Sequence, residues 1–459
     1  MILLDIDWSS VGVKVGQLLL SLSILVILHE FGHYITARWF GCRVERFFLF
    51  FDPWFALFKK KVGETVYGIG WLPLGGYVKI SGMIDESMDK EQLALPPQPW
   101  EFRSKPAWQR LIVMLGGVIM NVLTAIVIYA FITMVWGEKK VPLQSLKYGI
   151  AIQDSLLYQI GLKNGDNVVS VNGKEVADYR DLALRIAISD SLEVERNGQR
   201  LKLVIPTDMI GKLVERKRSM LLLPRTPATL GAVVDTLGAG KAGLRTGDRI
   251  LAVNGQPVGF FDELAPLVQP RKGQVAEVQF LRGKDTLSRQ VQISAEGKLS
   301  VAPFSYPYVR LQQMDSAGYL QFQVTRHGPL QAIPAGLRLA QKSLTDYIDQ
   351  FKKIVQPSTG GYKAVGGFKA IGNLFAPVWD WESFWMLTAF LSIMLAFMNL
   401  LPIPALDGGH VLFTLIEMIT GRKPNQKFLE IAQVIGMVLL LGLMLYANLN
   451  DWIGWGKGK

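Results

Sequence analysis

Cysteine and histidine are both scarce in this chain of 459 residues, which has one cysteine and four histidines. The single cysteine, Cys42, excludes the intrachain disulfide framework on which many small secreted domains depend. No cleavage site of the A-x-A type follows the first apolar run. We therefore expect no cleavable signal peptide and a retained apolar segment near the N-terminus.

Charge is missing from long stretches of the sequence. Half of the residues are apolar and the mean hydropathy is +0.25, so the chain is more apolar than an ordinary soluble domain. Four segments reach the length of about 20 apolar residues that a helix needs to cross a bilayer: residues 15–37, 111–135, 383–406 and 431–450. The first contains one charged residue, Glu30, and the other three contain none. The fold class that we predict is an all-helical membrane core with four spans.

Positive charge beside these spans predicts their orientation. The net charge is +11, and Lys and Arg are abundant between the first two spans and present between the last two. Because Lys and Arg favour the cytoplasmic side, both short connections should face the cytoplasm, and the middle region and both termini should face outside. The same clustering favours the lipid bilayer, and not nucleic acid, as the partner of the basic residues.

The middle region contains an internal repeat. Residues 161–173 and 243–255, which are 82 positions apart, share a Gly-Leu pair, a Gly-Asp pair and a Val-Asn-Gly end. Each copy predicts a turn, a short alternating strand and a second turn. Both copies resemble PDZ domains, which bind an extended peptide as an added strand. We expect two tandem PDZ-like β-rich domains at 138–222 and 223–304, between the second and third spans; two β domains without a ligand are the alternative.

An amphipathic helix is predicted between the repeats and the third span. Leu337, Ala340, Leu344 and Ile348 fall on one helical face of residues 330–356. This helix could lie on the membrane surface or pack under the β domains. It belongs to a linker at 305–380, which joins the first part of the membrane core, 1–137, to the second, 381–459.

The most specific motif is His29-Glu30-Phe31-Gly32-His33, which lies within the first span. On a helix, the two histidines occupy positions i and i+4 on one face, roughly 6 Å apart at Cβ. Both imidazoles can therefore bind one zinc ion, while Glu30 acts as the general base on the attacking water. A chance match is disfavoured, because a charged residue inside a span costs at least ~2.5 kcal/mol.

A catalytic zinc usually has three protein ligands, so one more is expected from elsewhere in the chain. The candidates at membrane depth are Asp407, His410 and Glu417. Pro402 and Pro404 break the third span, which lipid tolerates only where the freed backbone faces protein or a polar cavity. Asp407 follows this break directly, with two glycines behind it, and we favour it as the third ligand. His410 is the rival ligand, and it could instead orient Asp407 or bind nothing.

These features together resemble the site-2 protease family of intramembrane zinc metalloproteases, over nearly the whole chain. The resemblance rests on the histidine motif in a first span, a later Asn-x-x-Pro-x-Pro-x-Leu-Asp-Gly-Gly motif, and PDZ-like domains between spans. It implies that zinc is the cofactor, that His29, His33 and Asp407 bind it, and that Glu30 is the catalytic acid and base.

The resemblance also implies a substrate class and a location. Asn399, Pro402 and Pro404 are implied to shape the substrate-binding site. Substrates in this family are single-span membrane proteins already trimmed by another protease, such as anti-sigma factors in a stress response, or remnant signal peptides. The expected location is the bacterial inner membrane, with the PDZ-like domains in the periplasm. In the second span, Gly116-Gly117 and Asn121 stand where the family often has Gly-Pro and Asn; a helix–helix hydrogen bond is the alternative role for Asn121.

Residues 65–80 are apolar and glycine-rich and should lie on the cytoplasmic side. We interpret them as a hairpin that dips into the membrane interface. Its exposed edge, which includes Gly68 and Gly70, could hold an unwound substrate segment by β-augmentation. A membrane-seated hairpin with a structural role alone is the alternative.

Two functions from other classes compete with proteolysis. A metal transporter could use the same ligands, but the four spans show no internal repeat and transport does not require Glu30 between two histidines. A non-catalytic PDZ scaffold with a membrane anchor leaves the intramembrane His and Glu residues unexplained. The sequence therefore predicts hydrolysis of peptide bonds within transmembrane segments, with Glu30 moving the proton from water to the leaving amine.

Overall fold

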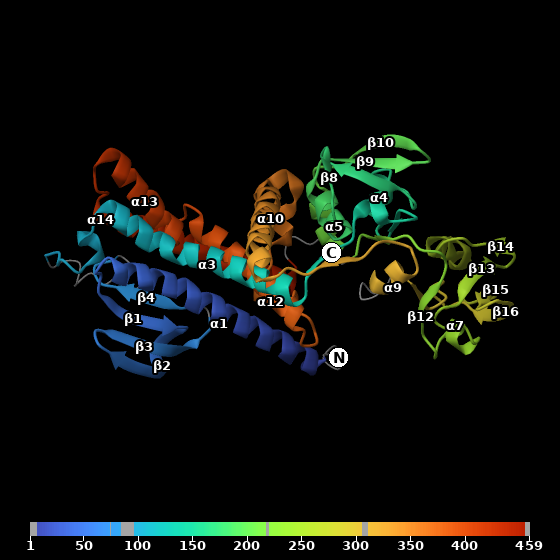
Figure 1. The fold of residues 1–459 in the computed structure, drawn as a ribbon, viewed down its shortest axis with the longest axis horizontal. Coiled ribbons are helices and arrows are strands. Elements are labelled where there is room, and N and C mark those ends of the chain that lie inside the picture. Colours follow the sequence, from blue (N-terminus) through green and yellow to red (C-terminus); the bar gives the residue numbers. More distant parts are fainter. Residues whose placement is uncertain (1–6, 74, 84–95, 217–219, 305–310, 455–459) are drawn as a thin grey trace. The chain divides into compact units, whose positions relative to one another are not determined.

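The chain divides into two compact units in a computed structural model that describes residues 7–73, 75–83, 96–216, 220–304 and 311–454. The membrane unit comprises residues 1–137, 326–352 and 365–459, and the β-rich unit comprises residues 138–325 and 353–364. Figure 1 traces both units along the sequence.

Four helices of the membrane unit are long and apolar enough to cross a membrane. They are α1 (Trp8–Trp39), α3 (Ala107–Val135), α12 (Trp381–Leu400) and α14 (Gln426–Ile453). The four predicted spans are thereby confirmed as helices. The other helices of this unit in the described residues are η1 (Phe102–Ser104), α10 (Pro329–Val355), α11 (Phe368–Gly372) and α13 (Asp407–Thr420).

The third span is shorter than the predicted 383–406. Helix α12 ends at Leu400, and α13 begins at Asp407 after a six-residue break. Pro402 explains the end point, because a proline disfavours helical backbone at the residue before it, here Leu401. Leu401 is extended, with φ −60° and ψ 142°. The break therefore places Asp407 at the first position of a new helix.

Helices α1 and α3 cross closely at small residues. A Cβ on Gly32 would lie 2.2 Å from the carbonyl oxygen of Gly116, and a Cβ on Gly116 would lie 2.5 Å from the carbonyl oxygen of Gly32. Such contacts are possible only between glycines, and small residues are the usual means of close helix packing in membranes. Because Gly32 lies between His29 and His33, this crossing turns both histidines toward α3.

A four-stranded sheet follows α1. It contains β1 (Val44–Leu49), β2 (Phe51–Val62), β3 (Thr65–Leu72) and β4 (Tyr77–Ile80), in the order β2-β3-β1-β4. The predicted hairpin at 65–80 is wrong, because β3 and β4 do not pair with each other. Strand β3 pairs with β1 in parallel, and β4 pairs with the other side of β1 in antiparallel fashion.

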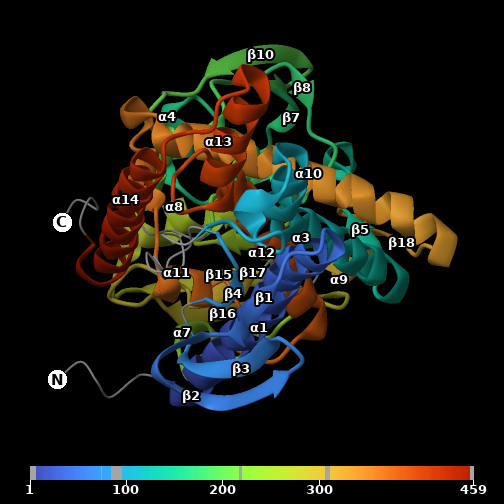
Figure 2. The same ribbon diagram turned by 90° about the vertical axis from the view of Figure 1, so that its left-hand side faces the viewer.

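This sheet packs beside the second half of α1 (Figure 2). The hydroxyl groups of Tyr34 and Tyr67 are 2.8 Å apart, and a Cβ on Gly76 would lie 2.7 Å from Val26. Strand β4 is fixed at its start by Tyr77, whose hydroxyl donates to Asp52 over 2.9 Å. Burial raises the pKa of the Tyr77 hydroxyl, so it remains a donor. The sheet thus spans about 12 Å of the helix, from Val26 to Tyr34.

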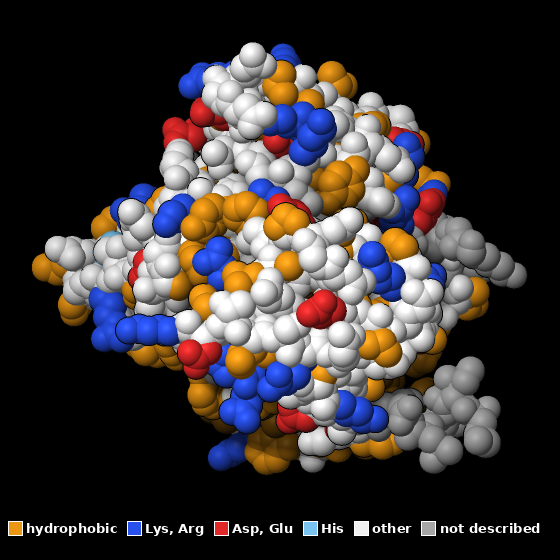
Figure 3. All heavy atoms as spheres, turned by 90° about the vertical axis from the view of Figure 1, so that its right-hand side faces the viewer, with side chains coloured by type: hydrophobic (Ala, Val, Ile, Leu, Met, Phe, Trp, Pro, Cys, Tyr) orange, Lys and Arg blue, Asp and Glu red, His pale blue; other side chains and the backbone are white. Residues whose placement is uncertain are grey.

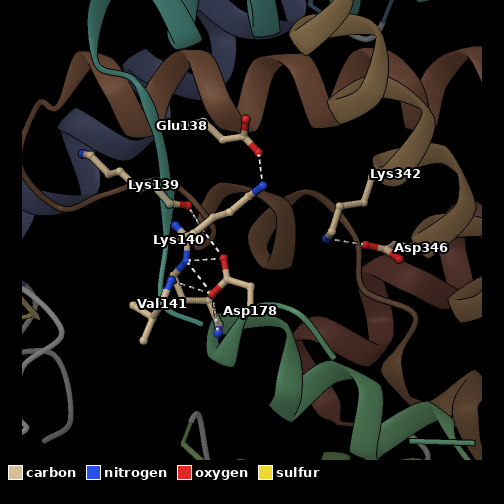
Figure 4. Close-up of polar contacts among 8 residues, drawn as sticks. Glu138, Lys139, Lys140, Val141, Asp178, Lys342 and Asp346 are labelled. Atoms are coloured by element: carbon tan, nitrogen blue, oxygen red, sulfur yellow. Dashed lines mark hydrogen bonds and ion pairs between the residues drawn. The ribbon is translucent and has the colours of Figure 1, made fainter. Parts of the chain in front are cut away.

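Helix α10 confirms the predicted amphipathic segment. Its buried residue Ala340 shares an apolar cluster with Tyr129 of α3 and Ala389 of α12. A Cβ on Gly336 would lie 2.6 Å from a carbonyl oxygen of α3. Lys342 and Asp346 of this helix form an ion pair of 2.8 Å in which the aspartate is buried (Figure 4). This helix therefore packs against two spans. The sequence had suggested the membrane surface or the underside of the β domains instead.

The β-rich unit begins with a core built from residues 141–222. Its strands and helices are β5 (Glu138–Lys140), η2 (Leu143–Ser145), β6 (Ile150–Ile152), α4 (Ser155–Gln159), β7 (Asn167–Val171), β8 (Lys174–Glu175), α5 (Tyr179–Ile188), β9 (Ser191–Arg196), β10 (Gln199–Val204), α6 (Met209–Glu215) and β11 (Leu222–Pro224). The sheet order is β10-β9-β7-β8, with β6 and β11 as a separate pair. Asp178 accepts the Val141 N–H at the start of this core, beside the Glu138–Lys140 ion pair (Figure 4).

A second core repeats this plan over residues 228–301. Its elements are β12 (Leu230–Val233), α7 (Gly238–Lys241), β13 (Arg249–Val253), β14 (Gln256–Pro257), η3 (Phe261–Glu263), α8 (Leu264–Val268), η4 (Gln269–Arg271), β15 (Val275–Arg282), β16 (Asp285–Gln292) and β17 (Val301–Pro303). The sheet order is β14-β13-β15-β16, with β12 and β17 as a separate pair. On the face in Figure 3, basic side chains are interspersed with acidic and apolar ones.

The repeat extends to one ion pair in each core, in which the aspartate is buried. Asp166 pairs with Arg196 in the first and Asp248 pairs with Arg282 in the second, both at 2.7 Å. Each aspartate belongs to the repeated Gly-Asp turn, and each arginine also donates to the carbonyl oxygen of the glycine that starts the repeat. The sequence repeat therefore reflects a structural one.

The predicted linker at 305–380 is only partly a linker. Helix α9 (Leu311–Ser316) contributes Leu311 and Met314 to the first core, and β18 (Gln323–Thr325) pairs with β5. The short helices η6 (Pro357–Thr359) and η7 (Gly361–Ala364) also belong to the β-rich unit. The first core is thus completed by residues that follow the second core in the sequence.

Candidate metal centre

Three possible metal ligands converge inside the membrane unit. Asp407 Oδ2 lies 3.3 Å from His29 Nε2 and 3.2 Å from His33 Nε2, and the two Nε2 atoms are 3.4 Å apart. Both histidines are buried. Among the described residues, these three form the one group of His, Cys, Asp or Glu side chains arranged to hold a metal ion.

The hydrogen bond of His33 to α3 fixes the tautomer of its neutral imidazole. Its Nδ1 lies 2.9 Å from the carbonyl oxygen of Val113, which can only accept, so Nδ1 carries the proton. In the neutral imidazole, Nε2 then carries a lone pair, and it faces Asp407 Oδ2, which is buried and has no hydrogen-bond partner among the described residues. Lone pairs that converge in a buried site repel one another, and a metal cation removes this repulsion.

The spacing of these atoms fits zinc. Donor atoms at about 2.0 to 2.1 Å from one tetrahedral zinc ion lie about 3.3 Å from one another, which matches all three separations. Two histidines and one carboxylate also form a known catalytic zinc set that leaves one position open. The residues present therefore fit this metal.

His29 is oriented by Asn121 of α3, whose amide nitrogen lies 3.1 Å from His29 Nδ1. The amide oxygen of Asn121 is buried and has no partner among the described residues. A half-turn of the amide, which leaves its shape unchanged, brings this oxygen to Nδ1, where it accepts the Nδ1 proton. His29 Nε2 is then free for a metal, in the way that outer hydrogen bonds commonly fix histidine ligands.

Gly117 of α3 provides the space for both imidazoles. A Cβ at this position would lie 2.4 Å from His33 Nε2 and 2.5 Å from His29 Cε1. No side chain can occupy that space without displacing a ring. The adjacent glycines of α3 thus have different tasks: Gly116 permits the helix crossing, and Gly117 accommodates the two ligands.

Asp407 is positioned by the break before α13 and by α14. Gly408 and Gly409 allow the chain to fold back tightly, because a Cβ on Gly408 would lie 2.2 Å from the carbonyl oxygen of Leu401. Gly436 of α14 contacts the same break, since its Cβ would lie 1.7 Å from the carbonyl oxygen of Pro404. Gln433 of α14 accepts the Ala405 N–H over 3.1 Å. Two helices therefore fix the position of this carboxylate.

The rival ligands are placed elsewhere. His410 does not belong to the group formed by His29, His33 and Asp407. Glu417 forms an ion pair of 2.5 Å with Arg110 at the start of α3. The geometry thus agrees with the choice of Asp407 over His410 and Glu417.

Glu30 lies beside the ligand group, at the edge of the sheet. Its carboxylate lies near the backbone of Val78 in β4. Gly76 contacts it as well, since a Cβ there would lie 3.4 Å from Glu30 Cγ. Among the described strands, β4 lies at the edge of the sheet, so its outer side is not paired with any of them. The catalytic candidate and an open strand edge are therefore neighbours.

The predicted substrate-contacting residues divide into two groups. Asn399, in the last turn of α12, has its amide nitrogen 3.2 Å from His29 Nε2, and Pro402 and Pro404 lie in the break that leads to Asp407. Gly68 and Gly70 lie in the central strand β3, where Gly68 is paired on both sides. Gly68 therefore does not lie at an open edge, contrary to the expectation, and β4 supplies the edge near Glu30.

Gly68 has a packing reason instead. A Cβ there would lie 2.3 Å from the ring of Phe48 in β1. The sequence did not predict the contacts of Val113 and Gly117 with the histidines. It indicated a polar role for Asn121 but not its contact with His29. An asparagine in an otherwise apolar span was the one available signal, since polar residues there are usually paired.

Two buried histidines and a carboxylate on apolar helices, with a glutamate next to one of the histidines, define a membrane-embedded metallohydrolase site. The comparison with protein families agrees: residues 17–443 match the model described as "Peptidase family M50". The chain belongs to this family and is a zinc metalloprotease of the site-2 type.

Individual relatives resemble the chain over nearly its whole length. A "Putative zinc metalloprotease" of Xylella fastidiosa (strain Temecula1) is 28% identical, covering 96% of this chain and 99% of the relative. The "Regulator of sigma-E protease RseP" of Salmonella typhimurium (strain 14028s) is also 28% identical, covering 98% of this chain and 99% of the relative. The resemblance expected from the sequence is thereby confirmed.

Proposed function

We propose that this protein cuts single-span membrane proteins within their transmembrane segments, using zinc held by His29, His33 and Asp407. The observation that carries this proposal is the converging group of three donor atoms on α1 and at the start of α13, spaced 3.2 to 3.4 Å apart. Helix α1 is one of the four candidate spans, so the group lies at membrane depth.

Each residue has a separate role in the proposed reaction. Zinc, when bound, would supply Lewis acidity for the attack of water on the peptide bond. Glu30 takes a proton from the attacking water and returns one to the leaving amine. Asn399 has an amide N–H close to the reacting region and stabilises negative charge on the substrate carbonyl oxygen.

Strand β4 is proposed to present the substrate to Glu30. A transmembrane helix must be unwound before its peptide bond becomes accessible, and an unwound segment needs partners for its backbone groups in a membrane. The open edge of β4 (Tyr77–Ile80) offers these partners by β-augmentation. The sequence suggested this role for the region of Gly68 and Gly70 in β3. We now assign it to the edge strand β4.

The two repeated cores of the β-rich unit are proposed to be PDZ-like domains on the outer side of a bacterial inner membrane, with both termini on the same side. The charge distribution beside the spans supports this orientation. The relative from Salmonella typhimurium is named as a regulator of sigma-E. We extend that role to this chain: its substrates would be trimmed anti-sigma factors or remnant signal peptides.

The test uses the purified full-length chain and a single-span test substrate in detergent. Cleavage within the transmembrane segment is expected, and a zinc chelator should stop it. Glu30→Gln should abolish cleavage while bound zinc stays nearly stoichiometric, because Glu30 is not a ligand. Zinc transport into vesicles without cleavage would favour the transporter, and loss of zinc from Glu30→Gln would overturn the assigned role.

A further inference from the structure

Strand β2 exposes an unusual amount of apolar surface. Trp54 is 91% exposed, Leu57 67%, and Phe55 and Phe58 57% each. The rings of Trp54 and Phe55 also stack on Trp71 of the neighbouring strand β3. A contiguous patch of this kind indicates contact with a partner or a membrane.

Three consecutive lysines follow this apolar segment on the same strand. Lys59, Lys60 and Lys61 are all exposed. None of them forms an ion pair with a residue in the described part of the chain. Aromatic residues followed by unpaired lysines are typical of a segment at the boundary between lipid tails and headgroups.

The position of the sheet places β2 at such a boundary. Contacts of Tyr67 with Tyr34 and of Gly76 with Val26 hold the sheet beside α1, which is a candidate span. Strand β4 faces Glu30, and β2 forms the opposite edge of the sheet. The apolar half of β2 is therefore turned away from the metal centre, toward the surroundings of the membrane unit.

The edge of β2 is poorly suited to pairing with a peptide strand. It contains Pro53, which lacks an N–H, and Trp54 has a positive φ of 72°. The pairing with β3 shifts register twice, between Phe51 and Ala56 and between Ala56 and Phe58. Proline, bulges and lysines are the features by which natural edge strands avoid further pairing. Lipid is thus favoured over a peptide as the partner.

We propose that Lys59, Lys60 and Lys61 bind the phosphate headgroups of anionic phospholipids, while Trp54, Phe55, Leu57 and Phe58 enter the adjoining tail region. Attraction to an anionic membrane surface is worth about fivefold in affinity per lysine, or about 100-fold for three. The site is separate from the proposed peptidase centre. Through it, the binding of the sheet to the membrane surface depends on the charge of the lipid headgroups.

A residue-resolved footprint tests the site in the full-length protein. The protein is placed in nanodiscs of phosphatidylcholine, with or without phosphatidylglycerol, and its lysines are acetylated by a water-soluble reagent. Phosphatidylglycerol should slow the labelling of Lys59, Lys60 and Lys61 fivefold or more, relative to the exposed Lys427 at the start of α14. If labelling of Lys427 slows equally, the general negative charge of the membrane surface explains the effect, and the proposal is overturned.

A charge-matched pair of variants gives a second measurement. Native mass spectrometry of the detergent-solubilised chain should show a preference for phosphatidylglycerol over phosphatidylcholine. Lys59→Gln/Lys60→Gln/Lys61→Gln should lower the phosphatidylglycerol affinity about 100-fold. The control replaces three exposed lysines of the β-rich unit with glutamine (Lys202, Lys241 and Lys284), and it should retain the preference.

Other outcomes identify other partners. Competition by millimolar glycerol phosphate as effective as that by the intact lipid would point to a site for free phosphate. Protection of the three lysines by a single-span substrate in pure phosphatidylcholine would point to a peptide on the β2 edge. Either result, or a lysine triple variant that keeps its lipid preference, contradicts the proposal.

Discussion

At the scale of single residues, the proposed metal centre depends on groups that are not among its proposed ligands. His33 is oriented by the carbonyl oxygen of Val113, and His29 is oriented by Asn121. The Val113 carbonyl and the Asn121 amide both belong to α3, whereas the histidines belong to α1. Helix α3 therefore acts as the template against which α1 presents its two ligands.

Gly117→Ala should remove zinc binding with little loss of folding. The added Cβ would lie 2.4 Å from His33 Nε2, so a ring must move away from the other ligands. Bound zinc is measured by metal analysis, and folding by thermal unfolding in detergent. Gly442→Ala in α14 is the control, since its Cβ would meet nothing within 4 Å. Normal zinc content in Gly117→Ala would show that the rings do not need this space.

Asn121→Leu should weaken zinc binding about 10- to 100-fold, the usual effect of removing a group that orients a ligand. Asn121→Asp keeps an acceptor for His29 Nδ1 and should bind nearly normally. Competition with a chelating dye measures the affinity. Ser392→Ala separates the two roles considered for Asn121, because Ser392 donates to the Asn121 backbone oxygen over 2.7 Å. If that variant loses as much affinity, helix packing and not ligand orientation explains Asn121.

The proposed ligands could be identified from the sequence, and the residues that support them could not. The spacing of His29 and His33 is a local property of one helix, and Asp407 follows two prolines that must interrupt another. Gly117 and Asn121 act through the crossing of α1 and α3, which no local pattern specifies. The distance between two helices is a tertiary property, so it appears only in the structure.

At the scale of elements, the same limit explains the error in the sheet. The sequence indicates that β3 is extended, but β3 pairs with β2 and with β1, and not with β4. A parallel pair needs a crossover, and a hairpin interpretation considers only adjacent strands. The spans behaved differently, because their length and lack of charge are sufficient to identify them.

Glu417→Ala should destabilise the membrane unit by about 3 kcal/mol or more, because it leaves Arg110 buried without its partner. The two side chains are only 10% and 12% exposed and join α13 to α3. A lower midpoint of thermal unfolding in detergent is expected, together with weaker zinc binding as Asp407 moves with α13. Asp349→Ala is the control, since the Asp349–Lys352 pair is largely exposed and should contribute little. An equal effect of both variants would exclude a special role for the buried pair.

At the scale of the whole molecule, residues 138–325 of the β-rich unit form one large insertion between α3 and α10, and residues 353–364 add a second, short segment. The chain leaves the membrane unit after α3 and returns to it at α10. The two ends of the insertion are joined by an antiparallel pair, in which Lys140 of β5 lies opposite Gln323 of β18. Both connections should lie on the outer side of the membrane, where the ectodomain of a substrate also lies.

This connectivity predicts that the β-rich unit acts as a size filter. A bulky folded ectodomain would compete with it for space on that side, and a short stub left by an earlier cut would not. No tight peptide ligand is required.

Removing residues 141–322, with Asn-Gly joining Lys140 to Gln323, closes the β5–β18 pair as a two-residue hairpin. The shortened protein should cut trimmed and untrimmed substrates alike, whereas the full chain should cut only the trimmed one. Cleavage of one substrate with and without a folded ectodomain is compared for both proteins, with zinc content as the measure of an intact membrane unit. A zinc-loaded deletion variant that still rejects the untrimmed substrate would rule out the filter.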